Sequence, residues 1–249
     1  MELIQKLTQQ LSQEQWWFIT LFVDLSAAII LYRLFGRIGL YAVVVFSLLF
    51  ANIQGPKLTV IFGLQTSMGV ILYSSIYFAT DLLSEKYGRA EAQRAVMLGF
   101  MVSVVLVIMS QISLQFLPST KPQTAVFANN VHNAMLTIFD YTPRFVAGSL
   151  LAYLISQSLD VYVFHKIRDA TNGKHLWLRN TGSTLISQAI DTLIYGLVVW
   201  WGIVDFFTAM QLALAKYVFK FVIAVFDTPF IYWARRWPPT NDKPMVLST

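Results

Sequence analysis

Seven long apolar stretches dominate the sequence and restrict it to the folds that a lipid bilayer permits. Each is close to the roughly 20 residues that a helix needs to cross the hydrocarbon core. Only helices and closed barrels satisfy their own backbone hydrogen bonds inside a bilayer, and runs of this length indicate helices. We therefore predict an all-α, polytopic transmembrane helical bundle with spans at 16–34, 39–55, 58–79, 95–117, 144–165, 183–204 and 207–233.

Composition supports one membrane domain rather than several soluble ones. Of the 249 residues, 56% are hydrophobic and 12% are charged, whereas soluble domains carry about 25% charged residues. The chain has no cysteine, which excludes disulfides, thiolate metal sites and a cysteine nucleophile. The net charge of +5 fits Lys and Arg retained in cytoplasmic loops. We therefore expect membrane lipid, and no nucleic acid, as a partner.

Two connections carry their own signals. Gly55-Pro56 separates the second and third spans, so we expect a tight helical hairpin there. Residues 118–143 form a longer connection between the fourth and fifth spans. Its middle, AVFANNVHNAMLTIF, has apolar residues at helical spacing and predicts a short interfacial helix.

The distribution of basic residues predicts the orientation of the spans. Most Lys and Arg residues lie in the loops after the first, third and fifth spans and in the C-terminal tail. The opposite side carries Lys6, Lys57, Lys121 and Arg144. By the positive-inside rule, the C-terminus is cytoplasmic and the N-terminus is outside. We expect a multi-pass protein of the cell inner membrane.

Polar side chains occur within three of the later spans. Intramembrane ionisable residues usually pair with each other or face a polar cavity. Asp160, Asp191 and Asp227 come from different spans but lie about 9–13 Å from the predicted cytoplasmic edge, at 1.5 Å per residue. We therefore expect a shared cavity, with Asp191 bound either to a ligand or to Lys220. The polar residues of these spans are Gln157, Asp160, Thr184, Gln188, Asp191, Tyr195, Lys216, Lys220 and Asp227.

Two earlier spans also contain acidic residues. Asp24 is expected to pair with a Lys or Arg of another helix for structural reasons. Asp81 and Glu85 close the third span, where the spacing of Glu85 and Arg89 favours a helical ion pair. Three interpretations of Asp81 remain open: a solvated helix end, a cytoplasm-side cavity, or an N-cap formed by Thr80 and Asp81.

A row of small residues marks the fifth span. Gly148, Ala152 and Ser156 follow one another at i+4 spacing, which lets two helices approach closely. The row predicts close packing within one chain or a homodimer contact.

Motifs for catalysis are missing from the sequence. The stretch ATNGKH departs from a phosphate-binding loop at both ends, and neither an H-E-x-x-H helix nor a G-x-S-x-G elbow occurs. His132, His165 and His175 are scattered over loops and helix ends. We expect no enzyme activity, cofactor or metal site.

Four motifs, taken in order, resemble the queuosine-precursor transporter family, also known as a vitamin uptake transporter family. They are ATDLLSEKYG, LISQSLDVYVFHKIR, LWLRNTGSTLISQAIDT and KYVFK, and the resemblance runs from about residue 40 to 235. It implies a six-helix core, 39–235, similar to the S-components of energy-coupling-factor importers. Residues 16–34 would then add an N-terminal span to a single transport domain, 1–249.

The resemblance also implies a substrate. Members import deazaguanine bases that carry a cyano or an aminomethyl group, so we expect an importer of 7-cyano- or 7-aminomethyl-7-deazaguanine. A carboxylate accepts the N–H groups of such a base, and an amide or a lysine donates to its O6. The candidate substrate-binding residues are Asp191, Gln188, Asp160, Gln157, Lys220, Asp81, Glu85 and Asn52.

Two alternatives to an autonomous importer stay open at this point. One is a vitamin-binding S-component that needs an energising partner module. The other is a membrane scaffold that transports nothing.

Overall fold

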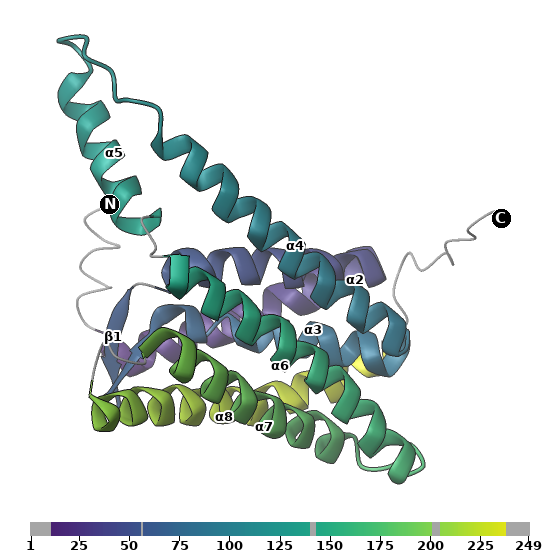
Figure 1. The fold of residues 1–249 in the computed structure, drawn as a ribbon. Helices are drawn as coiled ribbons and strands as arrows, with labels where there is room; N and C mark the ends of the chain where they lie inside the picture. The colour runs from purple at the N-terminus through teal and green to yellow at the C-terminus, as the bar shows by residue number, and fades with distance from the viewer. Residues whose placement is uncertain (1–10, 56, 140–142, 201–204, 238–249) are drawn as a thin grey trace.

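Most of the chain folds into helices that run side by side. The structure, a computed structural model, describes residues 11–55, 57–139, 143–200 and 205–237. Figure 1 shows α4 (Arg89–Leu114) crossing the bundle and extending beyond it, where α5 (Ala125–Phe139) lies beside its far end. The end of the sixth predicted span and the C-terminal tail from residue 238 fall outside the described residues. The architecture confirms the predicted all-α membrane bundle.

The first two predicted spans form the two arms of α2 (Gln13–Gln54), residues 13–35 and 37–54. They meet at Gly36, whose φ of 56° and ψ of −132° interrupt the helix. This region of backbone space favours glycine. Gly39 then packs so tightly that a Cβ there would lie 2.2 Å from the carbonyl oxygen of Leu31. The chain therefore reverses direction within a few residues. The sequence pattern had predicted a loop at this position, between the first two spans.

The predicted third span, 58–79, is wrong over its first half. β1 (Leu58–Ile61) and β2 (Leu64–Ser67) form an antiparallel hairpin, followed by a 3₁₀ turn, η1 (Met68–Val70), and α3 (Tyr73–Lys86). The turn residues Phe62 and Gly63 have φ of 50° and 75°, as two-residue hairpins require. A short apolar run does not distinguish strand from helix. The tight helical hairpin expected at Gly55-Pro56 is wrong for the same reason.

The later predicted spans are confirmed as helices. They are α4, α6 (Pro143–Ala170), α7 (Leu176–Tyr195) with a π-helical turn, η2 (Gly196–Trp200), and α8 (Phe206–Arg235). α5 confirms the helix expected between the fourth and fifth spans, and none of its residues is buried. Asp205 caps α8 and accepts hydrogen bonds from Thr208, which lower the pKa of its carboxyl. Among the described residues, α2, α4 and α8 are long and apolar enough to cross a membrane.

The first arm of α2 is tied to the rest of the bundle by specific contacts. Asp24 accepts hydrogen bonds from the Ser74 hydroxyl at 2.6 Å and from the Ser75 backbone N–H at 3.1 Å. It therefore caps the start of α3. The expectation of a basic partner for Asp24 is wrong, because a hydroxyl and a backbone amide satisfy the carboxylate instead. Trp17 of the same arm packs against Phe219 of α8, with ring centroids 5.9 Å apart.

Candidate functional site

A pocket opens at the end of the bundle where α3 begins. It holds about 940 Å³ of empty space, part of which is open solvent. Every helix from α2 to α8 contributes to its wall, so the pocket depends on the whole bundle rather than on one motif. The described lining consists of Ala51, Asn52, Ile53, Gly55, Ser67, Gly69, Val70, Tyr73, Leu106, Val107, Ser110, Gln111, Phe139, Leu150, Tyr195 and Lys216.

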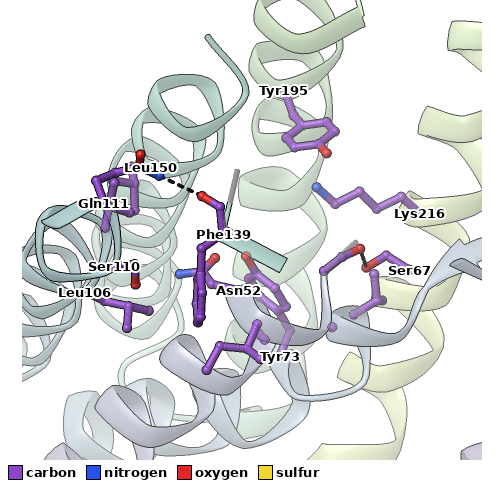
Figure 2. Close-up of a pocket in the computed structure, with 16 residues that line it drawn as sticks. Asn52, Ser67, Tyr73, Leu106, Ser110, Gln111, Phe139, Leu150, Tyr195 and Lys216 are labelled. Carbon is purple, nitrogen blue, oxygen red and sulfur yellow. Dashed lines mark hydrogen bonds between the residues drawn. The ribbon is translucent and has the colours of Figure 1, made fainter. Parts of the chain in front are cut away.

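Aromatic and polar side chains face each other across this pocket. Figure 2 shows Lys216 reaching from α8 toward the ring of Tyr195, with Asn52, Tyr73 and Phe139 on the other side of the space. The Lys216 ammonium lies 3.6 Å from the centroid of the Tyr195 ring. A lysine over a tyrosine face is a cation–π contact, which positions both groups.

A buried ion network stands directly behind this wall. The Lys220 Nζ donates to Asp191 Oδ2 at 2.6 Å and to Gln188 Oε1. Lys220 is fully buried, and its ammonium lies 4.4 Å from the centroid of the Tyr73 ring. A carboxylate partner for Lys220 is therefore confirmed, and it is Asp191.

Asp191 holds more than one partner. Its Oδ2 also lies 3.5 Å from the Lys216 Nζ, and its Oδ1 accepts from the Ser156 hydroxyl at 3.4 Å. Two lysines thus share one aspartate, which leaves one excess positive charge beside the pocket. We name Asp191, Lys216, Lys220, Gln188 and Ser156 the pocket network.

A second polar layer contains three buried aspartates. Ser187 donates to Asp160 Oδ1 at 3.0 Å, and Asn180 donates to Asp227 Oδ1 at 3.0 Å. The Asp81 carboxyl lies against that of Asp160, and within the described residues one oxygen of Asp227 has no hydrogen-bond partner. Among the described residues, none of the three forms a salt bridge. No group of three His, Cys, Asp or Glu residues in the described chain could hold a metal ion.

The three aspartates that were predicted to share one cavity have different neighbours, although Ser187 links Gln188 to Asp160 through hydrogen bonds of 3.5 and 3.0 Å. Asp191 belongs to the pocket network, whereas Asp160 and Asp227 belong to the second layer with Asp81. None of these carboxylates is among the lining residues of the pocket. Asp81 is fully buried in the middle of α3, so the interpretations as a solvated helix end and as an N-cap are both wrong.

The far end of α3 carries a different network. Glu85 pairs with Arg179 at 2.6 Å and with Arg235 at 3.0 Å, and Arg179 also donates to the Gly173 and Lys174 carbonyls. The expected helical pair of Glu85 with Arg89 is wrong. Gly88, with φ of 90°, separates α3 from α4, and Arg89 stacks on Tyr162 instead. We name Glu85, Arg179 and Arg235 the closed-end network.

The small-residue row of α6 is buried within the chain. Gly148, Ala152 and Ser156 all face the interior, and Ser156 contacts Asp191 of α7. This confirms a close packing role. It favours contact within one chain over a homodimer contact.

The eight candidate substrate-binding residues lie in different parts of the bundle. Asn52 lines the pocket, while Asp191, Gln188 and Lys220 stand behind it. Asp160, Gln157 and Asp81 are also buried and do not line the pocket, and within the described residues both amide atoms of Gln157 lack a hydrogen-bond partner. Glu85 lies in the closed-end network.

Sequence reasoning missed several pocket residues. Lys216 was recognisable only as a lysine in apolar sequence, one helical turn before Lys220. Tyr73 and Phe139 carried no signal, because aromatic residues are ordinary in membrane spans and their convergence depends on the fold.

Comparison with known proteins agrees with this architecture. A family described as "Putative vitamin uptake transporter" matches residues 67–234. The chain belongs to this family. The matched region contains the pocket network, the second polar layer and, of the closed-end network, Glu85 and Arg179. It begins at β2 and leaves both arms of α2, including Asn52, outside.

Family relatives carry informative names. A protein of Bacillus subtilis, "Probable queuosine precursor transporter", is 36% identical over 91% of this chain and 96% of its own length. The "Queuosine precursor transporter" of Escherichia coli is 30% identical over 66% of this chain and 70% of its own length. A Haemophilus influenzae relative is 27% identical over 66% of each chain. No solved structure matches.

Proposed function

We propose that this transporter-family member imports a queuosine precursor, a purine-like deazaguanine base, through the pocket described above. The observation that carries this proposal is the pairing of an aromatic pocket with a buried ion network directly behind its wall. The printed names of the relatives supply the substrate class.

The pocket suits a flat heterocycle. Tyr73, Tyr195 and Phe139 offer apolar ring surface for stacking. Asn52 and Ser110 can exchange hydrogen bonds with the edges of a base.

The candidate residues then take different roles. Asn52 contacts the base directly, and the Asp191–Lys220 pair with Gln188 positions the wall. Asp81, Asp160 and Gln157 are buried, and we assign them to the passage of the base through the bundle after it leaves the pocket. Glu85 contributes to stability and not to binding.

Orientation follows from the basic residues at the end opposite the pocket. Arg33, Arg37, Lys86 and Arg89 lie near the far end of α3, and such residues face the cytoplasm. The pocket then opens to the outside of the cell inner membrane, as an importer requires, and the C-terminal tail is cytoplasmic. A reporter fused to the C-terminus and active only outside the cytoplasm should stay inactive. An active reporter would contradict this orientation.

Uptake by the purified chain tests the function. Proteoliposomes that contain only this protein should accumulate 7-cyano- or 7-aminomethyl-7-deazaguanine, while adenine should compete poorly. Adenine places an acceptor where guanine has a donor. A vitamin-binding S-component would bind its ligand without transport until a partner module is added. A scaffold would show no shift in melting temperature with any base.

A further inference from the structure

The described wall of the pocket contains one charged side chain, and it is a cation. Lys216 lines the space with 22% of its side chain exposed, whereas no carboxylate is among the described lining residues. Asp191 lies behind Lys216 with both oxygens engaged by Lys220, Lys216 and Ser156. A positively charged ligand would therefore meet an ammonium first and would find no carboxylate in the wall.

Two of the three aromatic rings that line the pocket, those of Tyr73 and Tyr195, already contact a lysine ammonium. A ligand ammonium is usually attracted to the face of a tyrosine. Here the Lys216 ammonium lies 3.6 Å from the centroid of Tyr195, and the Lys220 ammonium lies 4.4 Å from that of Tyr73. Both tyrosines of the wall thus hold an internal cation. The Lys220–Tyr73 contact is separate from the lining charge and points in the same direction.

Resting on the proposed function, we propose that the pocket selects an uncharged, acceptor-bearing base over one with a cationic substituent, and that Lys216 sets this preference. In a 7-cyano-7-deazaguanine the nitrile and the O6 carbonyl lie on the same edge, so both acceptors can face one ammonium. A lysine carries three N–H donors, and Lys216 can keep Asp191 as a partner while it donates to this edge. A 7-aminomethyl group places an ammonium at the same position, where it is repelled.

Binding to the purified, full-length protein tests the preference. Dissociation constants at pH 7 should be measured calorimetrically for 7-cyano-, 7-aminomethyl- and unsubstituted 7-deazaguanine. Unit charges a few ångströms apart near a protein surface change affinity by about tenfold or more. The cyano base should therefore bind about tenfold more tightly than the aminomethyl base. Equal affinities, or tighter binding of the aminomethyl base, would overturn the proposal.

Substitutions at Lys216 test whether this residue causes the preference for the cyano base. Lys216→Gln should bring the two affinities within about threefold of each other, while Lys216→Arg should keep the preference. Lys166→Gln is the matched control, because Lys166 also covers a tyrosine ring, that of Tyr162 at 5.6 Å, but does not line the pocket. It should leave the ratio unchanged. An unchanged ratio in Lys216→Gln would overturn the role of Lys216.

Failure of the inference is distinguishable from failure of the proposed function. If no deazaguanine binds at all, both are overturned. If the bases bind but the charged one is not disfavoured, the proposed function stands and the preference does not. Should Lys216→Gln fail to fold, as judged by its melting temperature, the wild-type ratio together with Lys216→Arg still decides.

Discussion

Asp191 and Glu85 are both buried carboxylates that each contact two basic side chains. Asp191 stands behind the pocket described above, whereas Glu85 lies at the other end of α3. Lys220 contacts the Tyr73 ring at the start of α3, whereas Glu85 lies near the end of the same helix. At 1.5 Å per residue, about 18 Å separates these two positions. The closed-end network also binds the Gly173 and Lys174 carbonyls and so joins a loop to three helices. The pocket network instead leaves Lys216 facing open space.

A buried ion pair is therefore not by itself a binding site. Breaking a buried pair is costly wherever it lies, because one charge is left without compensation. A ligand role needs an adjacent cavity and a group that reaches into it. Lys216 is that group at the pocket end, and no described residue of the closed-end network lines the pocket.

The largest expected effect is at the closed end. Arg179→Met removes a fully buried guanidinium that contacts Glu85 and two loop carbonyls. Removing one partner of a buried pair costs about 3–5 kcal/mol, so the melting temperature should fall steeply. The affinity of the protein that remains folded should not change. A variant with a wild-type melting temperature and weakened binding would contradict a purely structural role for the closed-end network.

Lys220→Met should act mainly on transport. The change leaves Asp191 with Lys216 as its basic partner and removes the donor to Gln188. The loss of charge-assisted hydrogen bonds costs about 2–4 kcal/mol, or roughly 30-fold or more in uptake. Uptake should be measured per molecule that reaches the membrane, with Lys166→Met as the control. Normal uptake would leave Lys220 with a structural role at most.

Much of this contrast could not be predicted from the sequence. The helices were predictable because apolar length is a direct requirement of the bilayer, and the Lys220–Asp191 pair followed from the cost of an isolated charge at that depth. The hairpin at 58–67 was missed because its apolar residues match a helix in composition. The ion-pair partner of Glu85 was predicted wrongly because its actual partners, Arg179 and Arg235, are distant in sequence. The pocket wall was missed because it draws residues from α2 to α8.

Asp24→Ala tests a contact that holds the start of α3 and belongs to neither network. Asp24 caps the start of α3 beside Tyr73, and loss of a cap costs about 0.5–2 kcal/mol. The melting temperature should fall modestly, and Ser26→Ala on the same helix, an exposed position, should have no effect. Equal melting of the two variants would show that the first arm of α2 does not hold the pocket end in place.

Ser156→Ala should have the smallest effect. Its hydroxyl donates to Asp191 Oδ1 over a long 3.4 Å, and an ordinary hydrogen bond contributes about 0.5–1.5 kcal/mol. Affinity for the base should fall less than about threefold, because Lys220 and Lys216 still orient the carboxylate. A loss as large as that of Lys220→Met would mean that Ser156 itself contacts the ligand.

The most direct test compares Asp191→Asn with Glu85→Gln in one measurement. Both changes remove a single buried negative charge at nearly constant volume. Calorimetric affinity for 7-cyano-7-deazaguanine and melting temperature should be recorded on each purified variant. We expect Asp191→Asn to weaken binding by about 30-fold or more. We expect Glu85→Gln to lower the melting temperature with affinity retained. A folded Asp191→Asn protein with wild-type affinity would contradict a binding role for the pocket network.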